Sequence, residues 1–407
     1  MTFKRTLVLA PIALLISSAS SGQQLRFDDV VRNLRNPDPK TRLSSVRLLR
    51  EAKYPEAVAP LAPLVLDPLD DIQLETIGAE LSFFLEQDVK SKRMIGFVVE
   101  KRTRAVAAAA FDLGPLAVWP RPVPAELVTA LLQAADDSTP SVRLEAIYAL
   151  GVIAKAPLEA GQVQGLIKAL DHYDPMVRSG AARVIGRLKV REAGDALIKA
   201  VNDSKPEVRY AAMRALGAIR DTRAVGALSQ QLAFYKKGEG AWSAVDALAQ
   251  IGDPTSVPLF KERLQDKDPY IRRAAAEGLG RARDAGSGET LEKNVTVDES
   301  KMVRLASAFA LQTLGHNYAA RLIDLMSSAK VLAQGQEYLI ELGPAMTQTV
   351  LPRLQDPDPD LREALIDVLG VIGDASTLPA LDAAAKDSDD SVASAAKRAM
   401  ARIQAPK

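Results

Sequence analysis

Apolar residues recur along most of the chain with the spacing of one face of an α-helix. After Arg209, apolar residues follow at three, six, seven and ten positions, at Ala212, Ala215, Leu216 and Ile219. A half-buried strand would alternate at every second residue, so this spacing predicts an amphipathic helix. The same stripe follows the arginine of each Pro-x-x-Arg sequence, which we call the motif arginine: Arg143, Arg178, Arg209, Arg272 and Arg362.

A proline marks the expected start of each of these helices. Proline suits the first helical position, because its fixed φ matches a helix and its missing N–H has no helical partner there. An aspartate directly before the proline can cap the helix through its carboxylate. These aspartates are Asp38, Asp174, Asp268 and Asp358, and Thr139 takes the same place in another repeat. Lys205 cannot act as a cap, so Ser204 or Asp203 is expected to do so.

A second amphipathic run, such as Ala224–Leu232, lies between successive helices of this kind. Each unit is therefore helix, turn, helix, and Pro175 and Pro206 set a period of 31 residues. Neither helix can bury its stripe alone, so the units are expected to stack into a solenoid. Degenerate units at Gly240–Asp253, around Arg304 and at Leu332–Gly343 bring the expected number to about ten.

The repeated sequence D-x-D-P-x-x-R, followed by AA-x-x-LG-x-I-G-D, closely resembles the HEAT-repeat family. The short repeat is similar to that of phycobilin-lyase-type HEAT-like proteins. The resemblance covers about Leu25–Gln404, apart from one insertion, and implies an all-α protein with an α-α superhelix. A fold alone does not define a function, so function has to come from particular residues.

The first 22 residues predict a secretory signal peptide. Lys4 and Arg5 form a charged start, Thr6–Ile16 an apolar core, and Ser17–Gly22 a run of small residues suited to cleavage. The core is shorter than the roughly 20 apolar residues that cross a bilayer, so no membrane span is expected after cleavage. The protein is expected to be periplasmic or secreted, and without any cysteine it has no disulfide framework.

The rest of the chain divides into three predicted parts. Residues 25–85 are interpreted as N-terminal capping repeats, because terminal units of solenoids are often atypical. Residues 86–124 break the period as an insertion or linker, and residues 125–404 form the main solenoid. The insertion carries a basic cluster between Lys90 and Arg104 and a proline-rich end. Insertions often lie on the binding face, so this one is either a docking element or a stiff spacer.

Few residues of the chain suit catalysis or metal binding. The two histidines, His172 and His316, lie in expected turns, and no cysteine, Gly-x-Ser-x-Gly or phosphate loop is present. Deoxyhypusine hydroxylase shares the repeats, but its family holds iron on His-Glu pairs, and no such dipeptide occurs here. Phycobilin lyases also share the repeats, yet an exported chain would not meet cytosolic phycobiliproteins. We therefore expect no cofactor, no metal and no enzymatic activity.

The balance of charge argues against nucleic-acid binding. Removing Lys4 and Arg5 lowers the net charge from +1 to −1, whereas a nucleic-acid groove needs clustered positive charge to contact phosphates.

The second helix of each unit lines the concave face in HEAT proteins. Its positions one, five and nine after the motif arginine lie off the apolar stripe and are the expected partner contacts. Aromatic and arginine side chains are the usual anchors of protein interfaces. The candidate residues are Tyr148, Arg183, Arg187, Tyr210, Arg214, Trp242, Asp246 and Glu277. In the alternative interpretation, Arg214 pairs with Asp246 and Arg273 with Glu277 on ordinary surface; the motif arginines are expected to pair with turn aspartates.

The sequence thus predicts an exported, non-enzymatic HEAT-repeat scaffold, monomeric on its own, that binds a protein or peptide through its concave face. Two alternatives remain. One is an accessory or catalytic subunit of a lyase or hydroxylase type, and the other is a purely structural envelope spacer.

Overall fold

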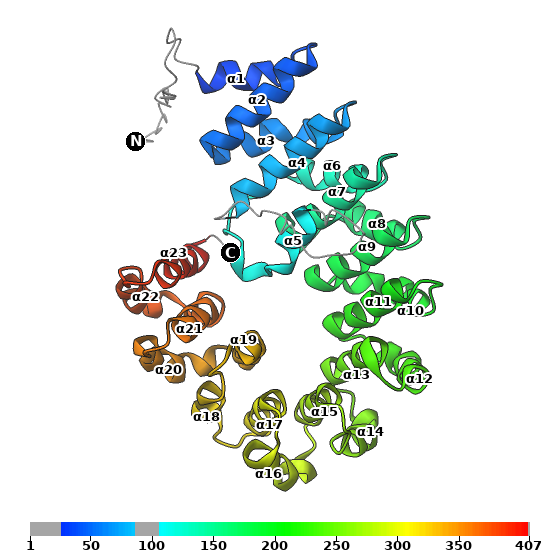
Figure 1. The fold of residues 1–407 in the computed structure, drawn as a ribbon, viewed down its shortest axis with the longest axis vertical. Coiled ribbons are helices and arrows are strands. Elements are labelled where there is room, and N and C mark those ends of the chain that lie inside the picture. Colours follow the sequence, from blue (N-terminus) through cyan, green and yellow to red (C-terminus); the bar gives the residue numbers. More distant parts are fainter. Residues whose placement is uncertain (1–25, 86–105, 406–407) are drawn as a thin grey trace, which may run out of the picture. The chain divides into compact units, whose positions relative to one another are not determined.

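The computed structural model of the chain describes residues 26–85 and 106–405 (Figure 1). The expected signal peptide, residues 1–22, and the basic cluster of the insertion lie outside the described residues. The described chain forms α-helices and short 3-10 helices and contains no β-strand. The predicted all-α class is therefore confirmed.

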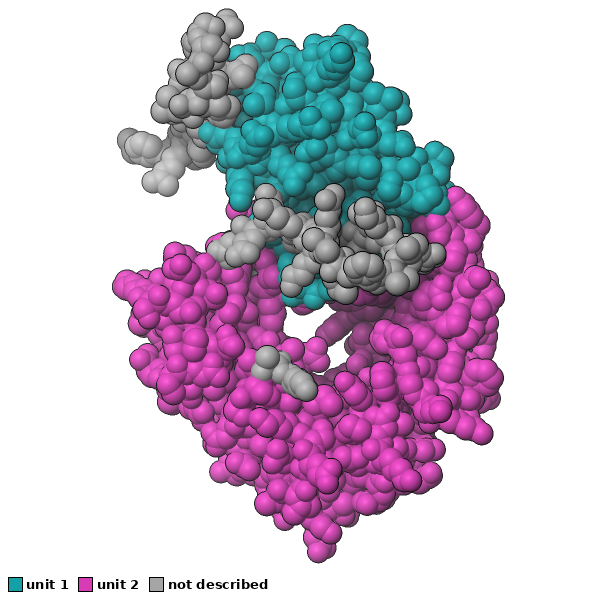
Figure 2. All heavy atoms as spheres, viewed as in Figure 1, with its two compact units in different colours: residues 1–113, 123–153 teal, residues 114–122, 154–407 magenta. Residues whose placement is uncertain are grey.

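The chain divides into two compact units (Figure 2). Unit 1 comprises residues 1–113 and 123–153, and unit 2 comprises residues 114–122 and 154–407. The helices of unit 1 are α1 (Phe27–Asn33), α2 (Pro39–Ala52), α3 (Val58–Leu61), α4 (Asp70–Phe84), α5 (Val106–Asp112), α6 (Ala125–Ala134) and α7 (Pro140–Ile153).

Unit 2 is a succession of helix pairs. Its first pairs are α8 (Ala160–Ala169) with α9 (Pro175–Leu188), α10 (Gly194–Ala200) with α11 (Pro206–Ile219), α12 (Val225–Tyr235) with α13 (Gly238–Ile251), and α14 (Val257–Arg263) with α15 (Pro269–Arg281). The later pairs are α16 (Gly288–Val297) with α17 (Lys301–Thr313), α18 (Ala319–Asp324) with α19 (Ala329–Leu342), α20 (Thr347–Val350) with α21 (Pro359–Ile372), and α22 (Leu378–Ala384) with α23 (Asp390–Gln404). The second helices of successive pairs pack side by side. Figure 1 shows these second helices, α9, α11, α13, α15 and α17, on the inner side of an arc, and the first helices, α8, α10, α12, α14 and α16, on its outer side.

Four of the predicted helix caps are confirmed. The carboxylates of Asp38, Asp174, Asp268 and Asp358 accept hydrogen bonds from backbone N–H groups in the first turn of α2, α9, α15 and α21. At α11 the N-cap position is Lys205, and no side chain caps the helix. Asp203 instead accepts at Oδ1 from the N–H of Lys205 at 2.8 Å, a bond within the turn, so the expected cap by Ser204 or Asp203 is wrong.

The apolar stripe is the core of the solenoid, and it brings neighbouring second helices very close together. Ala212, Ala215 and Leu216 are each at most 2% exposed. One position after Leu216, a Cβ on Gly217 would lie 2.8 Å from the Cα of Ala247. Only a residue without a side chain permits this approach of α11 to α13, so the Leu-Gly pair of the repeat is a packing requirement.

The motif arginines tie each unit to the next. Arg178 donates from Nε and Nη2 to Asp203, at 2.8 and 2.9 Å, and from Nη1 to the carbonyl oxygen of His172 at 2.8 Å. One guanidinium thus closes its own turn and holds the turn of the following unit. The same bidentate pair of hydrogen bonds joins Arg42 to Asp67, Arg272 to Asp298 and Arg362 to Asp387. The predicted pairing with turn aspartates is confirmed for these arginines.

The irregular turn before α13 replaces this aspartate with a tyrosine. Arg209 donates from Nε to the hydroxyl oxygen of Tyr235 at 2.5 Å. A Cβ added to Gly240 would lie only 2.3 Å from Cγ of Tyr235, so the tyrosine ring occupies the place of a side chain there. The glycine in this turn therefore makes room for the aromatic ring that replaces the usual carboxylate.

Candidate functional site

A pocket opens on the inner helices of unit 2, between α9 and α11. Its volume is about 470 Å³, and it is lined by Ser179, Arg183, Pro206, Glu207, Tyr210, Ala211, Arg214 and Glu239. Position one of α11 supplies Tyr210, and position five of α9 and α11 supplies the two arginines. Three of the predicted partner contacts are therefore brought together in one hollow.

The ion pair at this pocket is exposed, so a ligand can replace one of its partners. Arg214 donates from Nη2 to Glu239 at 2.8 Å, and both side chains are about half exposed. An exposed pair of this kind is worth only about 0–1 kcal/mol, so an incoming anion can compete with Glu239 for the guanidinium. Arg214 thus forms its ion pair with Glu239 and not with Asp246, as the alternative interpretation supposed, and acts on Asp246 only through its charge.

The phenol of Tyr210 faces the same pocket. Its ring packs against Tyr235 edge to face, with 5.4 Å between ring centroids. Burial raises the pKa of Tyr210, and the neighbouring Tyr235 hydroxyl raises it further. The phenol is therefore held in its protonated form at neutral pH and can act as a hydrogen-bond donor.

Two other predicted contacts lie close by but are held differently. Arg187 follows Arg183 by one turn on α9, and burial together with the charge of Arg183 lowers its pKa to about 10. Trp242 is half-buried, donates from Nε1 to Asp268 at 2.6 Å and packs on Tyr270 with 4.6 Å between centroids. Trp242 supports the next turn of the solenoid and is not among the residues that line the pocket.

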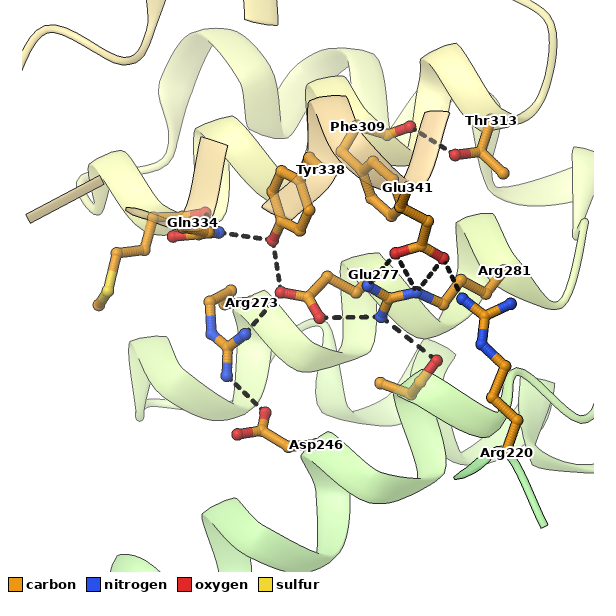
Figure 3. A network of polar contacts seen from close by, with 12 residues as sticks. Arg220, Asp246, Arg273, Glu277, Arg281, Phe309, Thr313, Gln334, Tyr338 and Glu341 are labelled. Carbon is orange, nitrogen blue, oxygen red and sulfur yellow. Dashed lines mark hydrogen bonds and ion pairs between the residues drawn. The ribbon is translucent and has the colours of Figure 1, made fainter. Parts of the chain in front are cut away.

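The acidic end of the predicted groove is a buried network instead of an exposed contact surface (Figure 3). Glu277, which is 4% exposed, accepts from Arg273 at 2.6 Å, from Arg281 at 3.0 Å and from the hydroxyl of Tyr338. Arg273 also donates to Asp246. The predicted role of Glu277 as an exposed contact is therefore wrong, while its predicted pairing with Arg273 is confirmed.

The network extends to α19 and back to α11. Arg281 donates from Nη2 to Glu341 at 2.9 Å, and Arg220 donates to the same carboxylate at 2.5 Å (Figure 3). Sequence reasoning missed Glu341 because α19 belongs to a unit whose motif is degenerate. Residues 60 or more positions apart meet here only because the solenoid curves.

The network sets the protonation of its own acids. Burial alone would raise the pKa of Glu277, but Arg273 and Arg281 hold it below its usual value. Burial raises the pKa of Asp246 to about 6, despite the opposing charge of Arg273. Asp246 therefore titrates near neutrality inside a network that links four inner helices.

Tyr148 is buried by a helix that the sequence did not place there. Its ring packs on Phe111 of α5, with 5.6 Å between centroids, and only 5% of Tyr148 is exposed. The backbone N–H groups of Val106 and Ala107, at the start of α5, each donate to Glu145 of α7 at 2.7 Å. The expectation that Tyr148 is an exposed partner contact is wrong, because α5 from the insertion covers this part of α7.

The described residues can also be considered as sites for metal ions and as membrane spans. Within residues 26–85 and 106–405, no group of three or more His, Asp and Glu side chains is arranged to hold a metal ion. No helix in the same part of the chain is long and apolar enough to cross a membrane.

Comparison with known families decides the family of the chain. Models described as HEAT repeats match residues 163–233, 237–312 and 347–407, and a HEAT repeat model matches residues 127–156. The chain belongs to the HEAT-repeat family. The predicted resemblance is thereby confirmed.

One curated relative and several solved structures are similar to this HEAT-repeat protein. The relative is the phycobilisome maturation protein of Synechococcus elongatus, 38% identical over 104 residues; the match covers 22% of this chain and 50% of the relative. An engineered protein is 19% identical, with a TM-score of 0.42 over 94% of this chain and 99% of its own. The CpcE–CpcF phycocyanin lyase complex of Nostoc is 19% identical, with a TM-score of 0.33 over 77% and 98% of the two chains. Human deoxyhypusine hydroxylase is 20% identical, with a TM-score of 0.29 over 69% and 96%.

These findings correct the prediction that the protein is not an enzyme. The sequence match is to a protein named for phycobilisome maturation, and this relative favours the lyase-type alternative. The match spans about half of the maturation protein, so activity and substrate are matters for proposal.

Proposed function

We propose that this HEAT-repeat protein is a lyase-type protein that binds a client protein along the inner helices of unit 2 and acts on it there. The observation that supports this most directly is the pocket at Arg183, Tyr210 and Arg214. It is the place on the groove where predicted contacts remain accessible and are not built into the core.

The pocket has the groups that a bond-making or bond-breaking site requires. Two guanidinium groups can hold a negatively charged part of the client or of its bound ligand. The phenol of Tyr210 lies beside them, and because its pKa is raised it can donate a hydrogen bond to a reacting group without losing its proton. Arg183 and Arg214 thus act in binding, and Tyr210 is the candidate hydrogen-bond donor.

The purely structural alternative suits only part of the groove. At Asp246 and Glu277 the inner face is occupied by the protein's own ion pairs, as expected for a stiff spacer. At Arg214 the single ion pair is exposed, so that part of the face remains open to a partner. A client is therefore expected to bind at α9 and α11 and not at α15.

A site-specific crosslink tests the binding surface. A photoreactive phenylalanine analogue replaces Tyr210 in one variant and Gln230, an exposed residue of the outer helix α12, in a matched control. We expect a defined client peptide to be crosslinked at position 210 only, identified by mass spectrometry. Equal labelling from both positions contradicts a client site in the groove.

A second experiment tests the lyase activity separately. Bilin-free phycocyanin subunits and free phycobilin are incubated with the protein as chemical probes, whatever compartment the protein occupies, and the intact masses of the subunits are followed over time. We expect the subunits to gain the mass of one added phycobilin, with no leaving group, and Arg183→Ala and Tyr210→Phe each to slow this gain by roughly tenfold or more, as for loss of one hydrogen-bonding group. Unchanged masses with every protein would rule out phycocyanin as the substrate, even where crosslinking succeeds.

A further inference from the structure

One of the protein's own helices, α19, docks on the inner helices of unit 2 and shows what that face can hold. Tyr338 of α19 stacks on Phe309 of α17, with 4.2 Å between ring centroids, and its hydroxyl donates to Glu277 of α15 (Figure 3). About one turn further along α19, Glu341 accepts from Arg281 of α15 at 2.9 Å. The helix therefore docks through an aromatic ring and a carboxylate that share one of its faces.

The residues that receive α19 stand at the positions expected to face the concave side. Phe309 and Glu277 are five positions after the arginines of their own repeats, and Arg281 is nine positions after its own. Unit 1 contains a parallel case on α7. There Tyr148, also at position five, packs on Phe111 of the short helix α5, with 5.6 Å between ring centroids. Position five thus receives an aromatic side chain of a docked helix in both units.

The pocket on α9 and α11 offers the same kinds of group at the same positions. Position one of α11 supplies the aromatic ring of Tyr210, and position five supplies Arg183 and Arg214. No carboxylate stands at positions one, five and nine of these two helices, which are Ser179, Arg183, Arg187, Tyr210, Arg214 and Ala218. The two acids that line the pocket, Glu207 and Glu239, come from other positions. Three arginines against two glutamates leave this surface with a net positive charge.

The spacing of the pocket residues suits a helix that docks in the manner of α19. Tyr210 and Arg214 are four residues apart on α11, so they are neighbours on one helix face, as Tyr338 and Glu341 are on α19. Arg183 lies on α9, which packs directly against α11. The pair of Arg214 with Glu239 is half exposed, so a carboxylate of a ligand can replace Glu239 at little cost.

We propose that the part of the client that docks at α9 and α11 is an amphipathic α-helix with an aromatic side chain and carboxylates on one face. The carboxylates bind Arg183 and Arg214, and the aromatic ring packs on Tyr210. Amphipathic helices commonly bind in grooves through groups spaced at three, four and seven residues. This inference rests on the proposed function, because it specifies the partner of the same pocket.

The test uses the full-length protein and a synthetic helix as the probe. The probe is a hydrocarbon-stapled, alanine-based peptide of about 15 residues, because shorter helices are marginal in water. It carries a tyrosine, a glutamate at the spacing of Tyr338 and Glu341, and a second glutamate one turn further on. One comparison peptide has lysine in place of both glutamates. The other has no staple and a central proline, which breaks the helix.

Fluorescence anisotropy of the labelled peptides gives the Kd for the wild-type protein and three variants. Arg183→Ala and Arg214→Ala remove the pocket arginines, which lie off the apolar stripe, so thermal unfolding should show both variants folded. Arg191→Ala is the matched control, because Arg191 is an exposed arginine in the turn after α9 and does not line the pocket.

We expect the acidic helix to bind the wild-type protein and the Arg191 variant equally. Each pocket variant should weaken its binding by roughly tenfold or more, because a charge-assisted contact is lost. The lysine and proline peptides should bind the wild-type protein at least about tenfold more weakly than the acidic helix.

Three outcomes would overturn the inference: no binding of the acidic helix, equal binding of all three peptides, or one affinity for the acidic helix in all four proteins. The crosslink from position 210 separates this failure from failure of the proposed function. If that crosslink still captures a client peptide, the client site stands and only its helical, acidic character is wrong. If it captures none, the client site itself is wrong.

Discussion

At the scale of single residues, the motif arginine contributes more than its place in a repeat suggests. Arg178 and Asp203 are 13% and 14% exposed, and three guanidinium nitrogens are satisfied at once. Hydrogen bonds to charged groups contribute more than neutral ones, and this one group closes two turns. Substitution should therefore loosen the junction between two units and not just one helix start.

Arg178→Ala should lower the free energy of unfolding by about 2–3 kcal/mol, since hydrogen bonds to charged groups are each worth roughly 1.5–3 kcal/mol and some water replaces them. Arg178→Lys should be less damaging but not neutral, because an ammonium group cannot bind Asp203 with two parallel bonds. Urea unfolding followed by circular dichroism measures both. Arg191→Ala, an exposed arginine of the same region, should change stability by less than about 0.5 kcal/mol; a similar loss there would show that the effect is not specific to the motif.

Glu80 is the residue that departs furthest from the repeat. In this unit Gln73 stands in the place of the motif arginine. Glu80, seven positions later, takes the place where other units have leucine, such as Leu216 and Leu248. It is fully buried, and neither carboxylate oxygen has a hydrogen-bond partner among residues 26–85 and 106–405. Burial therefore raises the pKa of Glu80 well above its usual value.

Glu80→Leu should raise the free energy of unfolding at pH 7.5 by about 1–3 kcal/mol, the cost of an unsatisfied buried polar group. The raised pKa means that the folded state holds the proton more tightly than the unfolded state. The contribution of Glu80 to stability should therefore be fully present below about pH 4.5 and be lost as pH rises through its folded pKa. Glu80→Gln, which cannot ionise, should lose this slope while keeping the shape of the side chain. Urea midpoints across pH provide the measurement, and a wild-type slope that persists in both variants would assign it to other groups.

At the scale of elements, the sequence predicted those helices that repeat a local rule. The caps at Asp174 and Asp268 and the stripe through Leu216 depend on neighbours within one or two turns, so one copy of the motif suffices to place them. The helix α5 could not be predicted as a cover for Tyr148, because it lies in the insertion, outside the period. The burial of Glu277 depends on Tyr338, 61 residues away, and no local pattern indicates that contact.

The turn into α13 gives a prediction at this scale. Gly240→Ala should lower stability by about 1–3 kcal/mol, because the new methyl group overlaps the Tyr235 ring and only a shift of that ring relieves it. The shift also breaks the bond from Arg209 to the Tyr235 hydroxyl. Tyr235→Ala combined with Gly240→Ala should cost less than the sum of the two single changes, because both remove the same interaction.

Gly226→Ala is the matched control on the neighbouring helix α12. A methyl group there meets nothing within 4 Å, so the higher helix propensity of alanine should stabilise the protein by up to about 1 kcal/mol. Thermal unfolding distinguishes the two glycines. Stabilisation by Gly240→Ala would contradict the packing of Tyr235 described above.

At the scale of the whole molecule, repetition made the fold predictable, while composition misled on function. Many copies of one motif agree on a helical solenoid, and a family model finds the same copies. The lack of cysteine and of His-Glu pairs suggested a protein without enzymatic activity, because the familiar metal and nucleophile sites are built from these residues. The pocket at Tyr210 draws its groups from different repeats, and a single motif cannot indicate that they meet.

The compartment of the protein is the remaining prediction at this scale. We propose that the N-terminal segment is removed on export, because Lys4 and Arg5 precede an apolar core that ends at Ile16 and is followed by small residues. Expression of the full chain in a bacterial host, followed by intact-mass analysis of the periplasmic fraction, should give a protein that lacks roughly the first 19–24 residues, since cleavage follows the small-residue stretch. Replacing Leu9 and Leu14 with aspartate should block removal, because a charged core no longer enters the export machinery, and the chain should then keep Met1. A periplasmic protein that retains Met1–Gln24, or a wild-type chain that stays with the cytosolic fraction at full length, would contradict export and would place the proposed client in the cytosol.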